Sequence, residues 1–205
     1  MVAAKGPFDK KRAAKPDEST TSPLLFCFVS PMFRSMAFSL AEILPIQNGS
    51  KNVIRAQWDT LSKLPGGKLL FSKLVGQVAP YTGTMGAIAE EVRQGYARVT
   101  LRDRRAVRNH LQCVHAVALV NLAELTGNLA LAYSLPDDAR FIVAGLSIEY
   151  KKKARGTLTA IAEPAVPATS ERREIPIVVS IRNSDGEEVA VATLRSLVGP
   201  KKQAN

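Results

Sequence analysis

The sequence has few cysteines, and this shortage excludes two kinds of site. Among its 205 residues only Cys27 and Cys113 are cysteines, and no secretory signal precedes them. Two thiols so far apart do not make a disulfide framework, so we expect a reducing compartment. His110 and His115 flank Cys113, but no CxxC or HExxH spacing adds the other ligands of a metal site. We therefore expect no metal.

Long uncharged apolar runs are also missing. No window holds the roughly 18 apolar residues of a membrane helix, so we expect a soluble chain without a transmembrane segment. The cytoplasm is the expected location. A mitochondrial presequence is the alternative, because the chain starts with basic residues and serines, although Asp9, Asp17 and Glu18 argue against it.

Aromatic residues are scarce at 6%, and no helix-turn-helix, zinc-finger or aromatic–basic pattern is present. Nucleic acid is therefore disfavoured as a partner. The net charge of +10 is still compatible with an anionic ligand. Most of the excess is local, since residues 51–110 carry 11 basic and 4 acidic residues, a net +7, whereas the net charge is +2 in 1–50 and +1 in 111–205.

Large apolar residues are nearly absent from 1–23, a stretch rich in Lys, Pro, Ser and Thr. Such a composition cannot bury enough surface to offset the entropy of ordering, so we expect disorder there. The chain divides into a largely disordered extension at 1–50, one domain at 51–200 and a tail at 201–205.

The domain contains a clear succession of periodic segments. Helical spacing predicts helices over 52–64 and 68–78, which should cover an edge or mouth of the fold, and a long helix over 115–133. Alternating apolar and polar residues predict strands over 96–103, 140–153, 157–163, 174–182 and 187–197.

The inward faces of these strands are also predicted by alternation. In the strand 140–153 one face should hold Ile142, Ala144, Leu146, Ile148 and Tyr150. Three strand connections are short, among them a turn at 154–156 and a hairpin at 183–186, so the sheet should be mainly antiparallel. The predicted fold class is α+β, with the long helix buried against the concave face of the sheet.

The long helix is short of charge. Glu124 is the only charged residue between His110 and Asp137, although an exposed helix of that length would carry several Lys and Arg. We therefore expect Glu124 to sit in protein and not in water, as carboxylates at active sites do. The alternative is a structural ion pair with an arginine across the fold. Asn121 and Asn128 lie one turn on either side of Glu124.

Three residues around this helix have the spacing found in hotdog-fold acyl-CoA thioesterases. Asn109 is followed by His115 six residues later and by Glu124 nine residues beyond that. Over roughly residues 65–200 the chain resembles the phenylacetyl-CoA thioesterase-like branch of that superfamily and a related family of unassigned function. The resemblance implies the hotdog fold, a long helix wrapped by an antiparallel sheet. The chain departs from the pattern where Ala116-Val117 replaces Gly-Gly.

The resemblance also implies roles for these residues in an acyl-CoA hydrolase that needs no cofactor beyond the coenzyme A of its substrate. Ala116 would donate its N–H to the thioester carbonyl, Glu124 would be general base or nucleophile, and Asn109 would orient water or the carboxylate. Nine helical residues span roughly 13 Å, so one thioester cannot reach both Ala116 and Glu124 of one chain. Relatives place the site across two subunits, which implies a homodimer and leaves a tetramer open.

Several alternatives stay open. His115 is either catalytic or a cap that bonds the start of the helix, and Asn121 and Asn128 contact the carboxylate, the substrate or the subunit interface. Cys113 as a nucleophile is a minor alternative, because no third group to orient it is evident. A non-catalytic protein that binds acyl chains or acyl-CoA is the second candidate function, since the Gly-Gly pair is lost. A dehydratase of the same fold is the third.

Two basic clusters are candidates for binding the phosphates of coenzyme A. One precedes the long helix and the other follows the strand 140–153, and together they comprise Arg98, Arg102, Arg104, Arg105, Arg108, Lys151, Lys152, Lys153 and Arg155. For any one of them, a solvated surface charge is the alternative.

Overall fold

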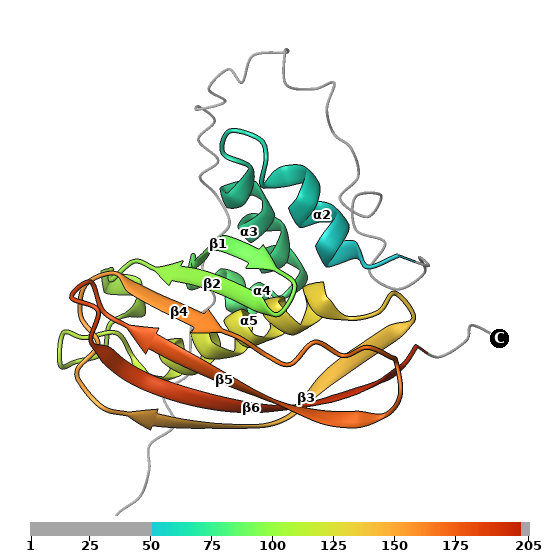
Figure 1. Ribbon diagram of the computed structural model, residues 1–205. Coiled ribbons are helices and arrows are strands. Elements are labelled where there is room, and N and C mark those ends of the chain that lie inside the picture. Colours follow the sequence, from blue (N-terminus) through green and yellow to red (C-terminus); the bar gives the residue numbers. More distant parts are fainter. Residues whose placement is uncertain (1–50, 202–205) are drawn as a thin grey trace, which may run out of the picture. The chain divides into compact units, whose positions relative to one another are not determined.

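The computed structural model describes residues 51–201 and shows one long helix wrapped by a curved sheet (Figure 1). The extension 1–50, with the disorder expected at 1–23, lies outside the described residues, as do residues 202–205 of the expected tail.

The α-helices and strands follow the predicted order with two additions. They are α2 (Val53–Leu61), α3 (Gly67–Val78), α4 (Pro80–Gly83), β1 (Ile88–Arg93), β2 (Tyr96–Leu101), the 3-10 turn η2 (Arg105–Val107), α5 (Ala116–Ser134), β3 (Ala139–Tyr150), β4 (Leu158–Ala162), β5 (Arg173–Arg182) and β6 (Glu188–Pro200). The additions are α4 and β1. A bulge between Ala89 and Glu91 breaks the alternation that would have revealed β1.

All strand pairs are antiparallel, in the order β1-β2-β4-β5-β6-β3. The predicted inward residues of β2 and β5 are buried, and both strands contact α5. These residues are Ala97, Val99, Leu101, Ile175, Ile177, Val179 and Ile181. The hairpin at 183–186 joins β5 to β6 as predicted. The α+β hotdog architecture is therefore confirmed.

The position of β3 in the sheet corrects the prediction. The turn at 154–156 does not make a hairpin between β3 and β4, because β3 pairs only with β6 at one edge of the sheet. β4 instead lies between β2 and β5. A turn read from local residues shows that the chain reverses, but not which strand it then pairs with.

The inward face of β3 was also predicted wrongly in its first half. A bulge between Val143 and Gly145 shifts the register against β6 and reverses the alternation. Leu146 and Ile148 pack on the core as predicted, whereas Ile142 is 67% exposed and Phe141 and Val143 take the inward positions. Tyr150 follows the predicted face but is half-exposed.

α5 lies close to the concave face of the sheet. A Cβ added to Gly127 would lie 3.0 Å from Leu194 Cδ2 and 3.4 Å from Ile177 Cγ2, so the glycine lets helix and sheet approach. By length and apolar composition, α5 is the one helix within 51–201 that could cross a membrane. Half of its apolar window is buried in the fold, as in a core helix.

α2 and α3 form a helical arm beside β1, the edge strand opposite β3 (Figure 1). Trp58 of α2 and Phe71 of α3 meet edge-to-face, with ring centroids 5.0 Å apart. The hydroxyl of Ser72 accepts a hydrogen bond from the N–H of Ala89 at 2.9 Å, which ties α3 to β1. The prediction that these helices cover an edge of the fold is confirmed.

Candidate active site at the start of the central helix

A tight loop leads into α5, and Asn109 organises it. Asn109 Oδ1 accepts hydrogen bonds from the N–H of Leu111 at 2.9 Å and from the thiol of Cys113 at 3.3 Å. Gln112 takes the left-handed conformation, with φ of 55°. The side-chain oxygen expected to orient water or carboxylate is thus engaged in holding the loop.

His115 caps the helix. Its Nδ1 accepts a hydrogen bond from the N–H of Val117 at 3.1 Å, and its own N–H donates to Val107 O at 2.8 Å. The capping alternative predicted for His115 therefore describes its observed contact. The N–H groups of Ala116 and Ala118 have no acceptor within residues 51–201. Together with the helix dipole, they make this end electropositive.

A hollow of about 470 Å³ lies against this helix start. Its lining comes from α4, η2 and the first two turns of α5, and comprises Tyr81, Thr84, Met85, Ala106, Val107, Arg108, His115, Val117, Ala118 and Asn121. Asn121 is 6% exposed, and its Oδ1 accepts a hydrogen bond from the hydroxyl of Thr82 at 2.9 Å. This bond fastens α4 over α5 and so shapes the hollow.

Tyr150 is a site residue that the sequence reasoning missed. It ends the inward face of β3, and its hydroxyl lies 3.5 Å from the carbonyl oxygen of Ala116. A half-exposed aromatic ring at the helix start is suited to lie against a bound ligand. Its place at the end of the predicted inward series was the available signal.

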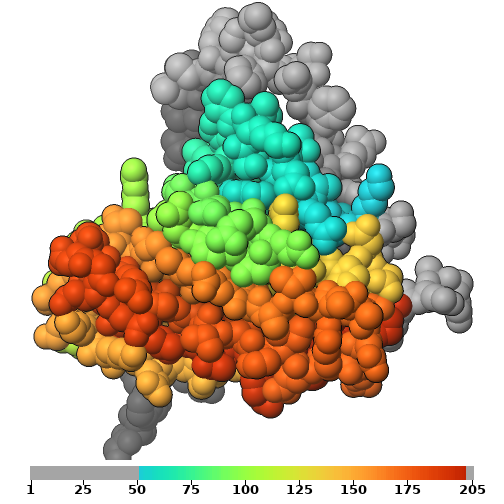
Figure 2. Space-filling view, viewed as in Figure 1, coloured from blue at the N-terminus to red at the C-terminus, as the bar shows by residue number. Residues whose placement is uncertain are grey.

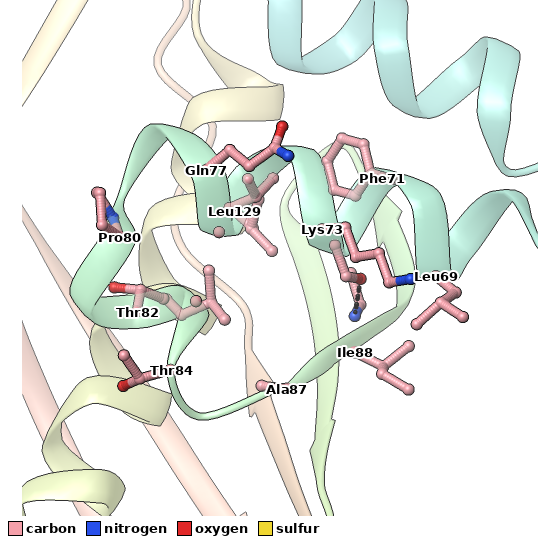
Figure 3. Close-up of a pocket in the computed structure, with 17 residues that line it drawn as sticks. Leu69, Phe71, Lys73, Gln77, Pro80, Thr82, Thr84, Ala87, Ile88 and Leu129 are labelled. Atoms are coloured by element: carbon pink, nitrogen blue, oxygen red, sulfur yellow. Dashed lines mark hydrogen bonds between the residues drawn. The ribbon is translucent and has the colours of Figure 1, made fainter. Parts of the chain in front are cut away.

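A second, larger hollow of about 670 Å³ adjoins the first, and Thr84 lines both (Figure 3). Leu125 and Leu129 of α5 contribute to its wall, together with residues of α3, α4 and β1. Figure 3 shows Thr82 and Thr84 at one side and Leu69, Lys73 and Ile88 at the other. The lining is mostly apolar, as in pockets for apolar ligands.

Glu124 was expected to be enclosed in protein, but in the single chain it is only half-buried. It makes no hydrogen bond or ion pair with any residue of 51–201, so the alternative of a structural ion pair is not found there. One turn on, Asn128 has a buried Oδ1 that also lacks a partner among the described residues. Two acceptors without donors thus share one face of α5.

The predicted phosphate-binding residues fall into two groups. Some are engaged within the chain: Arg104 donates to the carbonyls of Thr84 and Met85, Arg108 pairs with Asp103, Lys151 pairs with Glu188, and Lys152 pairs with Glu187. Arg98 is engaged as well, with Glu91 at 3.5 Å. Arg102, Arg105, Lys153 and Arg155 are exposed and make no hydrogen bond or close ion pair within 51–201. These four cations are open to a ligand.

The engaged cations act on the carboxylates that they touch. A hydrogen bond from Arg108 holds the pKa of Asp103 below its ordinary value. Hydrogen bonds from Lys152 and Lys151 lower the pKa of Glu187 and of Glu188 in the same way. Within residues 51–201 no group of three His, Cys, Asp or Glu side chains has the arrangement of a metal site.

Comparison with known proteins supports the fold. Residues 67–198 match the family described as a domain of unknown function, DUF4442. The crystal structure of the genomics target APC5556 is 32% identical, with a TM-score of 0.62 over 73% of this chain and 97% of that one. No curated protein matches the chain significantly.

Two more distant structures share the fold. One is PA5026 from Pseudomonas aeruginosa, described as a protein of unknown function and a probable thioesterase, at 21% identity and a TM-score of 0.59 over 67% of this chain and 97% of that one. The other is the thioesterase HI1161 from Haemophilus influenzae, at 17% identity and a TM-score of 0.56 over 65% and 93%. At these identities the likeness shows the fold alone, and it agrees with the hotdog resemblance.

Proposed function

The chain belongs to the DUF4442 family, and we propose that it hydrolyses acyl thioesters, with acyl-CoA as the substrate class. Proteins of the same fold that are described as thioesterases support the proposal. The observation that carries it on this chain is the start of α5, where the N–H groups of Ala116 and Ala118 have no acceptor within residues 51–201 and Ala118 lines a hollow.

These N–H groups suit the chemistry of thioester hydrolysis. When water attacks the carbonyl carbon, negative charge develops on the carbonyl oxygen, and the N–H groups of Ala116 and Ala118 can donate to it. Their orientation is set beforehand by the helix and by the cap from His115, so no reorganisation is needed during the reaction. As the tetrahedral intermediate collapses, its C–S bond breaks and coenzyme A leaves as the thiolate, which then takes a proton from solvent.

Glu124 is proposed as the base that takes the proton from water. It lies eight residues, or roughly 12 Å, along α5 from Ala116, so it serves the helix start of a second copy and not its own. Its lack of any hydrogen-bond or ion-pair partner within 51–201 fits a site completed by another chain. Asn128, with its unpartnered oxygen, lies beside it on that face.

The edge strand β3 is proposed as the place where the second copy binds. β3 is 12 residues long and pairs on one side only, with β6. A long edge with free N–H and C=O groups favours pairing with another strand. Pairing of β3 with β3 of a second copy around a two-fold axis would extend the sheet and create two equivalent sites.

The substrate fits the two hollows in a defined direction. The thioester lies at the helix start, beside Asn121 of the first hollow and near Tyr150, whose hydroxyl contacts Ala116 O. The acyl chain extends into the apolar hollow past Leu125 and Leu129. Arg105, Lys153 and Arg155 then bind the phosphates of coenzyme A.

Replacing all three by Glu should raise KM and its salt dependence with little change in kcat, and Arg172→Glu with Arg173→Glu is the matched control. An unaltered KM would show that these three residues are solvated surface charges that do not bind the substrate.

Thiol release from a panel of acyl-CoAs tests the activity, and Glu124→Gln tests the base. Loss of the base should lower kcat by roughly 10²- to 10⁴-fold with little change in binding. Glu163→Gln, an exposed carboxylate after β4, is the matched control. A folded Glu124→Gln protein with near wild-type turnover would refute the assignment.

Subunit sharing has its own test. Neither Glu124→Gln nor Ala116→Pro, which removes one N–H, should be active alone. A random mixture of the two should recover about one quarter of the wild-type activity, because half of the dimers then contain one intact site. No recovery in a mixture shown to exchange subunits would contradict the shared site.

A non-catalytic acyl-CoA binder is the second candidate, favoured by Val117 in place of a glycine at the helix start. Val117 is half-exposed there and narrows the space for a thioester. Saturable acyl-CoA binding with no thiol release across the panel would support this candidate over the hydrolase.

A further inference from the structure

The connection between α2 and α3, together with the first turn of α3, presents an exposed apolar surface, which we call the α2–α3 tip. It comprises residues 63–70, and Leu64, Leu69 and Leu70 within it are 54%, 46% and 47% exposed. Figures 1 and 2 show that the arm carrying the tip rises from β1, on the side away from β3 and β6. Three half-exposed leucines on one short segment form a patch that indicates a binding surface.

The charge around the tip is mainly positive. Residues 60–89 contain three lysines, Lys63, Lys68 and Lys73, and no Asp or Glu. Lys68 lies 3.8 Å from Glu90, whereas Lys63 and Lys73 have no ion pair within the described residues. Exposed leucines rimmed by lysines are the composition of segments that insert shallowly into anionic lipid surfaces.

The tip also borders the mouth of the apolar hollow. Leu69 belongs to both, and Lys73 lies one helical turn further along α3 at the same mouth (Figure 3). A surface that lies at the bilayer boundary would therefore bring the hollow within reach of acyl chains. The hollow and the leucines would share one apolar environment.

We propose that the α2–α3 tip docks on an anionic lipid bilayer, with Leu64, Leu69 and Leu70 in the acyl boundary and the lysines at the lipid phosphates. The unpaired positive charges of Lys63 and Lys73 favour this occupant over a second copy, which would place like charges against each other. The docking does not depend on thioester hydrolysis.

Co-sedimentation of the full chain with vesicles tests the docking. Binding is expected to vesicles with about a quarter phosphatidylserine, to weaken with salt, and to be weak on pure phosphatidylcholine. Leu64→Ser with Leu70→Ser should lower the partition coefficient about tenfold, and Lys63→Gln about fivefold. Neither change touches the hollow, so thioester turnover in solution should stay unaltered.

Matched controls lie elsewhere on the surface. Val166→Ser with Val178→Ser replaces two exposed valines, and Arg172→Gln removes an exposed cation. Equal binding to both vesicle types, or equal binding by the tip variants and wild type, would overturn the proposal. So would a tip variant that changes only the assembly size in light scattering, since that would make the tip a contact between copies. Vesicle binding without thioester turnover would refute the proposed function alone.

Discussion

The two ends of α5 differ in whether their backbone groups without helical partners form hydrogen bonds to the rest of the chain. At its C-terminal end, Asn52 and Arg55, at the start of α2, donate hydrogen bonds to carbonyls that no helical N–H can reach. Asn52 Nδ2 donates to Ala132 O at 2.6 Å, and the Arg55 guanidinium donates to Tyr133 O at 3.0 Å and to Leu135 O at 2.6 Å. This end is closed.

The N-terminal end stays open. His115 satisfies one N–H, but those of Ala116 and Ala118 have no partner in the described chain, and Ala118 lines a hollow. A carbonyl left open at the other end would cost stability, whereas an open N–H beside a hollow is available to a ligand oxygen. The difference indicates that one helix serves stability at one end and binding at the other.

Among changes at the two ends of α5, Ala116→Pro should give the largest effect. Proline is tolerated at the first position of a helix, so the change removes one N–H without disturbing α5. We expect kcat to fall about 10²- to 10³-fold with an unchanged melting temperature. Ala116→Ser, which keeps the N–H, is the control. Full turnover by a folded Ala116→Pro protein would show that the open end takes no part in the reaction.

Asn52→Ala and Arg55→Ala test the closed end. Asn52→Ala removes the donor of Ala132 O, and Arg55→Ala leaves Tyr133 O and Leu135 O with only the longer bonds from Asn52 Nδ2. Each change should lower the free energy of unfolding by about 1–3 kcal/mol. Chemical denaturation measures this loss, and kcat of the remaining folded protein should be unaltered. Lys51→Ala, an exposed neighbour, is the control. A fall in kcat without a fall in stability would contradict the inference that the C-terminal end of α5 serves stability alone.

Asp103→Asn tests the loops that flank the open end. Asp103 is 8% exposed and accepts hydrogen bonds from Arg108 at 2.6 Å and from the N–H of Gly156 at 3.0 Å. Its lowered pKa means that its stabilisation is fully present above its ordinary pKa of about 3.9 and is lost as pH falls through the folded value. At neutral pH the substitution should cost about 1–2 kcal/mol.

The pH dependence provides the control for Asp103. Wild type and Asp103→Asn should differ in unfolding free energy at neutral pH and converge in acid, when Asp103 is protonated in both folded and unfolded wild type. A difference that stays constant down to about pH 2 would show that the charge of Asp103 does not provide the stabilisation.

His115 should give the smallest effect. His115→Ala leaves the N–H of Val117 open and should cost about 1 kcal/mol of stability. His115→Asn replaces the cap with another good one and should restore that loss. If His115 only caps, His115→Asn keeps kcat within a few-fold of wild type. A fall of more than about tenfold in that variant would make His115 part of the chemistry.

Much of the fold was predictable because its signals are local. The period of residues 115–133 identified the central helix, and alternation identified the inward faces of β2 and β5. β1 was missed and the inward face of the first half of β3 was predicted wrongly, because a bulge in each strand breaks the alternation that the prediction depends on.

The sequence predicted which residues lie at the candidate site better than it predicted which partners they contact. The spacing of Asn109, His115 and Glu124 located the helix start, but the engagement of Asn109 in its loop and the pairing of Arg108 with Asp103 appear only in three dimensions. Tyr150 reaches Ala116 across 34 residues, and Asn52 reaches the end of α5 across 80. A one-dimensional pattern reports which face a residue occupies, whereas its partner depends on how distant segments pack. For that reason the chain's apolar periodicity determined α5 and its sheet, and packing alone decided which end of α5 is closed.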